Sequence, residues 1–343
     1  MSFGEFKATD TSQDTQKMTL SHTVSIYRVK PLTDSLLFAL DSPLKNKKMK
    51  VIFTLFLTCL TVTMFAQTKL QIVKKSISKT WDYKEGFEVN IEGEKATIDV
   101  ETWNRNEVRV DIVLLSKHPD RSVAEADLNA MQYTAEQHGR NIYFRNFIKV
   151  EPGAEKPQSG LQAIYTVTLP AECPVYLKNS FGDATVNNLT KYLKLNTKFT
   201  KVGLNNLSGE TFAATRFGDI EAQGLSGKVF IDAKRSDVTL REITGIVDIT
   251  TEYGVLKLFT ERNSELALNI NAVRSDVYFF DPNPTENGYA LEAKYGNITA
   301  PEDLKFNYIQ NTDVMKHVEF KPSNQTATMS VKISFGDVVI RKP

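Results

Sequence analysis

Histidine and cysteine are scarce in this 343-residue chain, which holds four histidines and two cysteines. None of them has a second histidine or cysteine at zinc-ligand spacing, and no phosphate-binding glycine loop or nucleophile elbow is present. Basic residues number 42 and acidic residues 41, a net charge of +1, so no long-range field favours nucleic acid or anionic lipid. The sequence therefore predicts no catalytic, cofactor-binding or metal-binding residue and no cofactor.

Long apolar runs are also lacking, apart from one of about twelve residues, 51–62, that follows a basic stretch. A small residue, Ala66, ends the segment. This order is typical of a secretory signal peptide, which we predict over residues 49–66. The run is short for a membrane span, and a retained anchor is the alternative. Residues 1–48 fit no export signal, so we interpret them as a non-structural leader or as the result of a start site assigned upstream of Met49.

The two cysteines do not predict a disulfide in an exported protein. Cys59 lies in the signal segment, and the residue before it, Thr58, is not the small residue that a lipoprotein signal needs. Cys173 would then be the one cysteine of the mature chain. We expect it to be a buried small apolar residue and not a reactive thiol.

What the sequence does contain is a short repeat with an interval of eighteen residues, which widens to twenty-one toward the C-terminal end. An aromatic residue or an arginine marks each repeat and opens a tripeptide such as Phe-Gly-Asp, Arg-Ser-Asp or Tyr-Gly-Asn. These marker residues, here called the anchors, are Phe181, Phe199, Phe217, Arg235, Tyr253, Arg274, Tyr295 and Phe335. A repeat this short and regular is typical of stacked solenoid turns.

Apolar and polar residues alternate on both sides of each anchor, as in half-buried strands. Ile231 precedes Arg235 by four residues, for example, and Leu240 follows it by five. Because one apolar set lies at even offsets and the other at odd offsets, the two share a core only if the chain bends at the anchor. We expect the glycines after the anchors to supply this bend through a positive φ. They are Gly182, Gly218, Gly254, Gly296 and Gly336.

Each repeat therefore predicts one rung, which consists of two short strands and two corners. One rung cannot bury its apolar face alone, but parallel rungs stacked in register bury it continuously. We predict an all-β fold, a parallel β-solenoid or β-roll with rungs of 18–21 residues over residues 174–343, in which Ile231 lies beside Ile249. The alternative is an antiparallel sandwich with evenly spaced strands, although nothing in a sandwich requires such regular spacing.

Both ends of the repeat region are irregular. Forty residues separate Tyr295 from Phe335, and we interpret this stretch as a distorted rung or as a cap on the open end of the stack. Residues 68–173 precede the repeats and predict a small strand-rich region with one short helix, whose capping box would join Ser122 and Glu125. We expect this region to cap the N-terminal end of the solenoid and to share its core.

Aspartate recurs two residues after the anchors, so Asp219 and Asp237 would lie on adjacent rungs, about 4.8 Å apart. Two carboxylates this close can bind a cation such as Ca²⁺, or act as an acid/base pair on an acidic polysaccharide. The structural alternative, which we favour, is that aspartate after glycine is a turn residue that bonds nearby backbone groups. The residues at this position are Asp183, Lys201, Asp219, Asp237, Val255, Asp276 and Asn297.

The anchors themselves would stack along one edge of the solenoid. A column of aromatic rings with interleaved arginines gains stacking and cation–π energy of about 0.5–1 kcal/mol per exposed pair, without any ligand. An exposed aromatic stripe also suits sugar rings or a protein partner. We favour the structural role, because the column recurs along the whole repeat.

The repeat segments resemble those of a bacterial β-strand-repeat family of adhesin-like proteins, a domain of unknown function. The similar segments are Ser180–Val186, Arg216–Ala222 and Ser334–Ile340, together with Trp103–Val110 and Tyr165–Pro170 upstream. The resemblance covers most of the chain after the signal segment. It implies the same repeat fold and attachment at a surface, but it supplies neither a ligand nor catalytic residues.

We therefore predict an exported, non-enzymatic β-solenoid that acts as an adhesin or as a structural or binding protein of the cell envelope. It would lie in the periplasm, on the outer-membrane surface or outside the cell. Its partner would be an unknown protein or glycan, with no nucleic acid and no membrane span after signal cleavage. The alternatives are a polysaccharide-active β-helix enzyme that uses Asp219 and Asp237, and a periplasmic partner of an envelope-signalling system.

Overall fold

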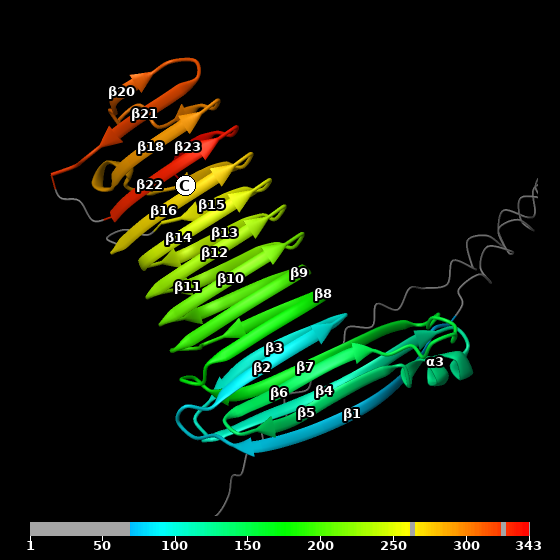
Figure 1. Ribbon diagram of the computed structural model, residues 1–343. Coiled ribbons are helices and arrows are strands. Elements are labelled where there is room, and N and C mark those ends of the chain that lie inside the picture. Colours follow the sequence, from blue (N-terminus) through cyan, green and yellow to red (C-terminus); the bar gives the residue numbers. More distant parts are fainter. Residues whose placement is uncertain (1–68, 261–264, 324–326, 343) are drawn as a thin grey trace, which may run out of the picture. The chain divides into compact units, whose positions relative to one another are not determined.

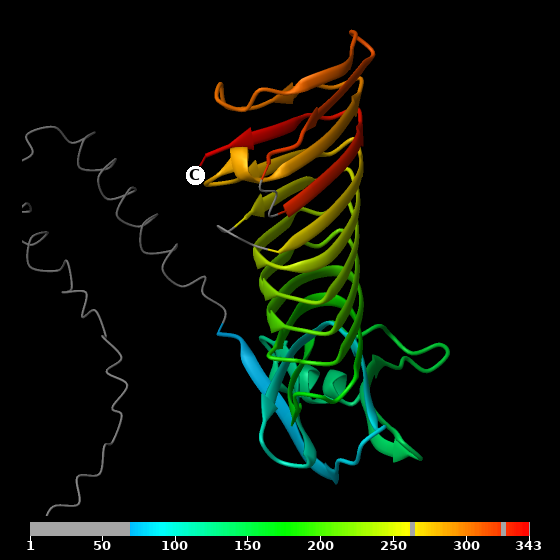
Figure 2. The same ribbon diagram turned by 90° about the vertical axis from the view of Figure 1, so that its left-hand side faces the viewer.

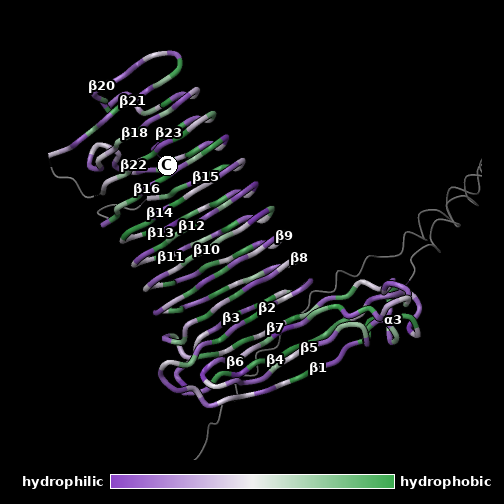
Figure 3. Tube along the Cα trace, viewed as in Figure 1, coloured by the Kyte–Doolittle hydropathy of each residue, from purple (hydrophilic) through white to green (hydrophobic). Residues whose placement is uncertain are grey.

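The chain forms one continuous sheet of stacked strands in a computed structural model that describes residues 69–260, 265–323 and 327–342. The predicted leader and signal peptide, 1–66, and with them Cys59, lie outside these residues. Hydrophobic and hydrophilic residues alternate along the strands (Figure 3), and the buried apolar residues form one core cluster. The fold is all-β and solenoid-like, as predicted.

Each rung contributes one strand before its anchor and one after it, and strands of adjacent rungs pair in parallel (Figures 1 and 2). The strands before the anchors form a first stack in the order β8 (Val175–Asn187), β9 (Tyr192–Leu207), β10 (Glu210–Arg216), β12 (Lys228–Lys234), β14 (Gly245–Glu252), β16 (Leu266–Val273), β22 (Ala327–Ser334) and β18 (Gly288–Lys294). Strands β8 and β9 continue past their anchors into a second stack, which goes on with β11 (Ile220–Leu225), β13 (Val238–Ile243), β15 (Val255–Phe259), β17 (Asp276–Phe280), β23 (Val338–Arg341) and β19 (Ile298–Thr299). Ile231 pairs with Ile249 in register and both are buried, which confirms the predicted stacking.

The bend between the two strands of a rung occurs at the anchor, not at the glycine after it. All eight anchors have a positive φ, between 51° at Arg274 and 64° at Phe181. Of the five glycines that we expected to bend the chain, Gly182 alone has a positive φ. The predicted role of these glycines was therefore wrong. A left-handed residue reverses the side-chain alternation, which turns both apolar sets toward one core.

Close contact between rungs explains why glycine nevertheless follows many anchors. A Cβ added at Gly218 would lie 2.1 Å from the carbonyl oxygen of Thr200, and one at Gly254 would lie 2.0 Å from that of Ser236. Rungs with serine or threonine at this position alternate with the glycine rungs. The Ser236 hydroxyl accepts a hydrogen bond from the Gly218 amide (3.2 Å) and donates one to the Lys234 carbonyl (3.0 Å). From Gly182 to Ser275 the repeating unit is thus a pair of rungs, whereas at the end of the stack two glycine rungs, those of Gly336 and Gly296, are adjacent.

The last rung in the sequence is not the last rung in space. Strand β22 lies between β16 and β18, and β23 lies between β17 and β19. The rung of Phe335 is therefore inserted between the rungs of Arg274 and Tyr295. This order corrects the predicted sequential stacking, in which Tyr295 would follow Arg274 directly. The rung of Tyr295 thus comes earlier in the sequence than the rung of Phe335 that separates it from Arg274.

An antiparallel hairpin of β20 (Asn307–Asn311) and β21 (Met315–Phe320) covers this end of the stack, where β21 pairs with β18 (Figure 1). This hairpin confirms the predicted cap. The turn before β18 contains a 3₁₀ helix, η2 (Pro284–Glu286), beside the buried carboxylate of Asp281. The Asn287 amide donates to this carboxylate at 2.6 Å, and the Tyr289 hydroxyl donates to it as well.

At the other end, the strands β2 (Glu88–Glu94) and β3 (Ala96–Trp103) form an additional rung that the sequence analysis missed. Both pair in parallel with β8, so Lys95, with φ of 51°, takes the place of an anchor below Phe181. A Cβ at Gly182 would lie 2.1 Å from the carbonyl oxygen of Ala96, the same contact as between later rungs. The sheet thus continues across the predicted boundary at 173/174, which stays a prediction.

Two strand layers extend from this additional rung. One consists of β6 (Asn141–Ile148) and β5 (Met131–His138), and the other of β7 (Gly160–Pro170), β4 (Glu107–His118) and β1 (Gln71–Asp82). The predicted helix is α3 (Arg121–Leu128), which packs on β4 and β1. Its N-cap is Asp120, which accepts from the Ser122 amide at 2.8 Å, while Glu125 pairs with Arg121 at 2.8 Å. The predicted capping box was therefore wrong.

The close contact at Gly218 yields a stability prediction. We expect Gly218→Ala to lower the free energy of unfolding by about 3 kcal/mol, because the new Cβ meets a backbone oxygen that cannot move without disrupting the stack. Denaturant unfolding of the purified chain measures this loss. Gly160→Ala is the matched control, since its nearest neighbouring atoms would lie 3.8 Å away. Equal stability of the two variants would contradict the account.

Candidate functional site

The aspartates of the predicted ladder bond the backbone of the next rung. Oδ1 of Asp219 accepts from the Asp237 amide at 3.0 Å, and Oδ1 of Asp237 accepts from the Val255 amide at 2.8 Å. The same bond joins Asp276 to the Asp337 amide at 2.9 Å, which reflects the inserted rung. These carboxylates satisfy backbone donors where strand pairing is interrupted, which is the structural role that we favoured. In the part of the chain that the structure describes, no group of three His, Cys, Asp or Glu side chains is placed to hold a metal ion.

The anchors form the predicted column along one edge. Ring centroids are 4.9 Å apart from Phe181 to Phe199 and again from Phe199 to Phe217, with the planes within 6° of parallel. The guanidinium of Arg235 continues the stack, 5.4 Å from the Phe217 ring and 5.6 Å from the Tyr253 ring. Stacked aromatics and cation–π contacts of this kind stabilise neighbouring rungs by about 0.5–1 kcal/mol per pair.

The column continues through the inserted rung to the end of the stack. Arg274 lies 5.3 Å from the Tyr253 ring and 5.9 Å from the Phe335 ring, and Phe335 stacks on Tyr295 at 5.0 Å. The side chains are about half exposed, but stacking covers the faces of the interior rings and leaves their edges to solvent. A sugar ring needs an open aromatic face, so this geometry favours a structural role for the column.

The outer face of the first stack carries a different feature, a groove of about 730 Å³ formed by β5, β6, β2, β8 and β9. We call it the junction groove, because the N-terminal strands meet the repeats there. Parallel register places its outward residues in two rows. The first row is Tyr143, Asn90, Tyr176 and Lys194, and the second is Arg145, Glu92, Lys178 and Asn196.

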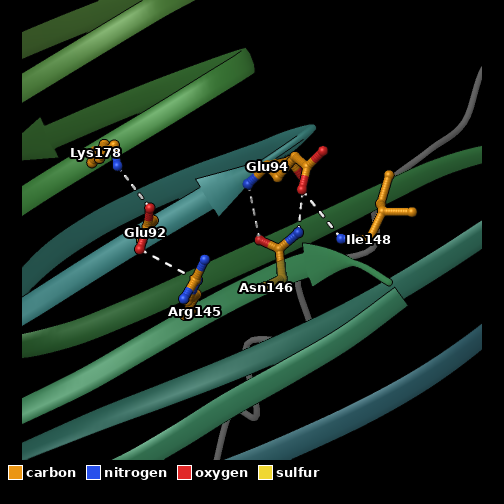
Figure 4. A network of polar contacts seen from close by, with 6 residues as sticks. All are labelled: Glu92, Glu94, Arg145, Asn146, Ile148 and Lys178. Carbon is orange, nitrogen blue, oxygen red and sulfur yellow. Dashed lines mark hydrogen bonds and ion pairs between the residues drawn. The ribbon is translucent and has the colours of Figure 1, made fainter. Parts of the chain in front are cut away.

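The charged row of the junction groove forms a fixed ion-pair network (Figure 4). Oε1 of Glu92 accepts from Nζ of Lys178 at 2.8 Å, and its Oε2 lies 3.3 Å from Nε of Arg145. The Arg145 guanidinium also lies 5.1 Å from the centroid of the Phe147 ring. The Lys178 hydrogen bond, helped by the Arg145 charge, holds the pKa of Glu92 below its ordinary range, although partial burial opposes this effect.

A second network beneath this row fixes β6 against β2. The buried Asn146 side chain donates to the Glu94 carbonyl at 2.7 Å and accepts from the Glu94 amide at 3.3 Å (Figure 4). The Glu94 carboxylate accepts from the Ile148 amide at 3.2 Å. Backbone pairing of β2 with β6 stops at Glu92, so these side chains continue the connection and hold Arg145 in place.

The rims of the junction groove are aromatic. Tyr143 is 37 % exposed, and its ring lies 6.1 Å from that of His138 at a tilt of 48°. Tyr176 contacts Tyr192 at 5.4 Å with a tilt of 45°. His138 itself pairs with Glu136 at 3.0 Å. In contrast to the anchor column, these rings are tilted against their neighbours and form no parallel stack; Tyr143 is partly exposed and Tyr176 is half-buried.

None of the groove residues was predicted from the sequence as a site. Glu92 and Lys178 are 86 residues apart, and they meet only because β2 belongs to an additional rung. The signal was present, since Val89, Ile91, Ile98 and Val100 occupy the apolar positions of a rung around Lys95. The alternation was recognised as strands, but the missing glycine concealed the anchor.

Cys173 is fully buried, as expected. Burial, together with the nearby Glu172 and Glu88 carboxylates, raises the pKa of its thiol to about 12. The thiol therefore stays protonated at neutral pH and lacks the thiolate form that nucleophilic reactions need.

The sequence profile of a family described as Toastrack DUF4097 matches residues 87–341. A Bacteroides fragilis structure described as a "putative adhesin" is 10 % identical, with a TM-score of 0.43, and covers 78 % of this chain and 97 % of its own. A Parabacteroides distasonis structure with the same description is 12 % identical, with a TM-score of 0.38, and covers 79 % of this chain and 97 % of its own. No curated protein matches the chain. None of the helices in the described ranges has the length and apolar character needed to cross a membrane.

The aspartate ladder yields a second prediction. We expect Asp237→Ala to lower the free energy of unfolding by about 1 kcal/mol, because the Val255 amide loses its acceptor. Asp237→Asn keeps an acceptor oxygen and should lose less. Denaturant unfolding compares both with Asp183→Ala, whose carboxylate accepts no hydrogen bond within the described residues. An Asp183→Ala loss as large as that of Asp237→Ala would refute the structural role.

Glu92 yields a prediction on pH. Its pKa is depressed in the folded chain, so its contribution to stability is present above the ordinary value of 4.5 and is lost as pH falls through the folded value. We expect Lys178→Met to raise the Glu92 pKa toward 4.5, as measured by carboxyl-carbon NMR titration. Lys228→Met is the control, since it removes the ion pair with Glu210 on later rungs. If the pKa of Glu92 is the same in Lys178→Met as in the unchanged protein, the Lys178 hydrogen bond is not the cause of the depressed pKa.

Proposed function

Because the chain belongs to the Toastrack DUF4097 family, we propose that it is an exported, non-enzymatic β-solenoid that acts as an adhesin or another surface-binding protein of the cell envelope. The predicted signal peptide over residues 49–66 supports export. The stacked rungs support a role in presenting a surface, since a solenoid holds outward side chains at fixed intervals. The junction groove is the surface that we assign to binding.

One observation carries the proposal. The junction groove joins partly exposed aromatic rings, such as Tyr143, to the fixed charges of Arg145, Glu92 and Lys178 in one open concavity. Convergent polar groups beside apolar ring faces are characteristic of ligand sites. The charges are positioned by pairing across three strands, so this charged row is preformed and loses little conformational freedom on binding.

The alternative of a polysaccharide-active enzyme depends on Asp219 and Asp237 as an acid/base pair. Each carboxylate accepts a hydrogen bond from a backbone amide of the next rung. This bond fixes each side chain and uses one of the oxygens that proton transfer would require. These hydrogen bonds therefore support a structural role for the ladder over catalysis.

Fractionation tests the proposed function. We expect the mature chain, without residues 1–66, in the envelope or outside the cell, and we expect protease added to intact cells to degrade it. The purified chain should leave acidic polysaccharides uncleaved, because we assign it no catalytic residue. A cytoplasmic, protease-protected chain would contradict export. Cleavage of an acidic polysaccharide by the unchanged protein but not by Asp219→Asn would instead establish the alternative, a polysaccharide-active enzyme.

A further inference from the structure

We infer that the junction groove binds an acidic glycan, that is, a chain of sugar rings that carries carboxylates. The inference rests on the proposed function and names the ligand class for it. Three features of the groove support it independently: partly exposed aromatic rings at suitable spacing, cationic side chains with unused donors, and an elongated shape.

The aromatic faces are spaced for successive sugar rings. Tyr143 and Tyr176 lie on either side of Asn90 in the same row, two strand spacings apart, or about 10 Å. This separation lets one sugar ring rest on each tyrosine while another ring lies between them. The apolar face of a pyranose packs on an aromatic ring, and its hydroxyls remain free for hydrogen bonds.

The floor between the two tyrosines has an unmet donor. Nδ2 of Asn90 is buried and has no hydrogen-bond partner in the described structure. A buried donor without a partner is costly, and the cost is recovered when an acceptor reaches it. A hydroxyl or ring oxygen of a sugar held between Tyr143 and Tyr176 would reach this buried donor only if side chains around it moved.

The charges favour an anionic ligand. Both oxygens of Glu92 are already held by cations, whereas the cations keep unused donors. Arg145 contacts Glu92 through Nε, and within the described residues no hydrogen bond engages its terminal nitrogens. Lys194 is exposed at the end of the same groove and has no ion pair among these residues. Guanidinium and ammonium donors in this arrangement match a carboxylate.

The shape favours a chain over a compact ligand. A second groove of about 300 Å³ shares Lys194 and Asn196 with the junction groove and continues across β10, β12, β14 and β16. Asp232 and Asp248 line this second groove, so it extends the shape of the track but not its positive charge. The combined track crosses the strands, and from β6 to β14 its floor consists of strands that are paired on both sides. The strand β5, at one end of the track, pairs with β6 alone among the described residues. A peptide that joined this edge by β-pairing would lie parallel to the strands, so a ligand that follows the track depends on side chains.

Isothermal titration tests the inference with the purified chain. The acidic probes are oligogalacturonate, oligomannuronate and hyaluronan fragments, the neutral probe is maltooligosaccharide, and a hexaglutamate peptide supplies the charge without sugar rings. We expect at least one acidic oligosaccharide to bind at least ten-fold more tightly than either control probe. We also expect raised salt to weaken that binding, because the contacts are charged and solvent-accessible.

Variants assign the binding to the groove. We expect Tyr143→Ala and Arg145→Gln each to weaken it about ten-fold, which corresponds to about 1.4 kcal/mol. Tyr143→Phe should retain it, because the ring face remains. Tyr308→Ala, on the distant hairpin β20–β21 and at a 56 % exposed tyrosine, should leave it unchanged. Thermal unfolding of each variant verifies that it is folded.

Several results would overturn the inference. If the neutral oligosaccharide binds as tightly as the acidic ones, the groove does not recognise the carboxylates. If hexaglutamate binds as tightly as the acidic oligosaccharides, the groove does not recognise the sugar rings. Failure of all acidic oligosaccharides to bind, or binding that persists in both Tyr143→Ala and Arg145→Gln, would reject the groove as a glycan site. A chain that is surface-exposed in fractionation but binds none of the probes contradicts the ligand class alone, whereas a cytoplasmic chain contradicts the proposed function.

Discussion

At each anchor the backbone turns into the left-handed region, and the residue that follows lies directly against the backbone of the neighbouring rung. At Gly218, a Cβ would stand 2.1 Å from the Thr200 oxygen, so the rungs reach strand spacing there only because glycine has no side chain. The rest of the repeat structure depends on this contact. Once it fixes the spacing, every residue lies above its counterpart on the next rung, and the sequence repeat becomes a set of side-chain ladders, apolar inside and polar or aromatic outside.

Such ladders are stable only if a residue tolerates a copy of itself, or a compatible residue, at about 4.8 Å. Aromatic rings do so by stacking, and the two arginine anchors, Arg235 and Arg274, lie between rings and so avoid each other. Aspartates are harder to stack because they repel. The ladder accommodates them by hydrogen bonds to backbone amides and by interruptions at Lys201 and Val255. Repulsion between like charges thus limits how often the same residue can recur in a ladder on the outer surface. The apolar residues of the core carry no charge and have no such limit.

Sequence periodicity predicts what depends on local register, and it fails where register is set by distant contacts. Ile231 and Ile249 pair as predicted, since their spacing encodes the pairing. The insertion of the Phe335 rung has no such code in the spacing, because it depends on pairing between strands far apart in the chain: β22 pairs with both β16 and β18, and the hairpin strand β21 pairs with the other edge of β18. We assigned the bend to the glycines after the anchors because of their conformational preference. Glycine is instead required at these positions by the close contact with the backbone of the neighbouring rung, which no sequence pattern displays. The rung of Lys95 was missed for the same reason, since Ala96 stands in the glycine position.

A repeat makes a rigid scaffold, but by itself it offers a ligand the same surface at every rung. A distinct site needs residues that the repeat does not dictate, placed beside residues that it holds in register. The junction groove has this composition: Lys178 and Tyr176 come from the first rung of the repeat, while Arg145 and Tyr143 come from a strand outside it. Glu92 lies between the two groups and contacts both. The N-terminal region therefore does more than cover an edge of the sheet, because it provides the half of the groove that makes the site unlike the surface of the later rungs.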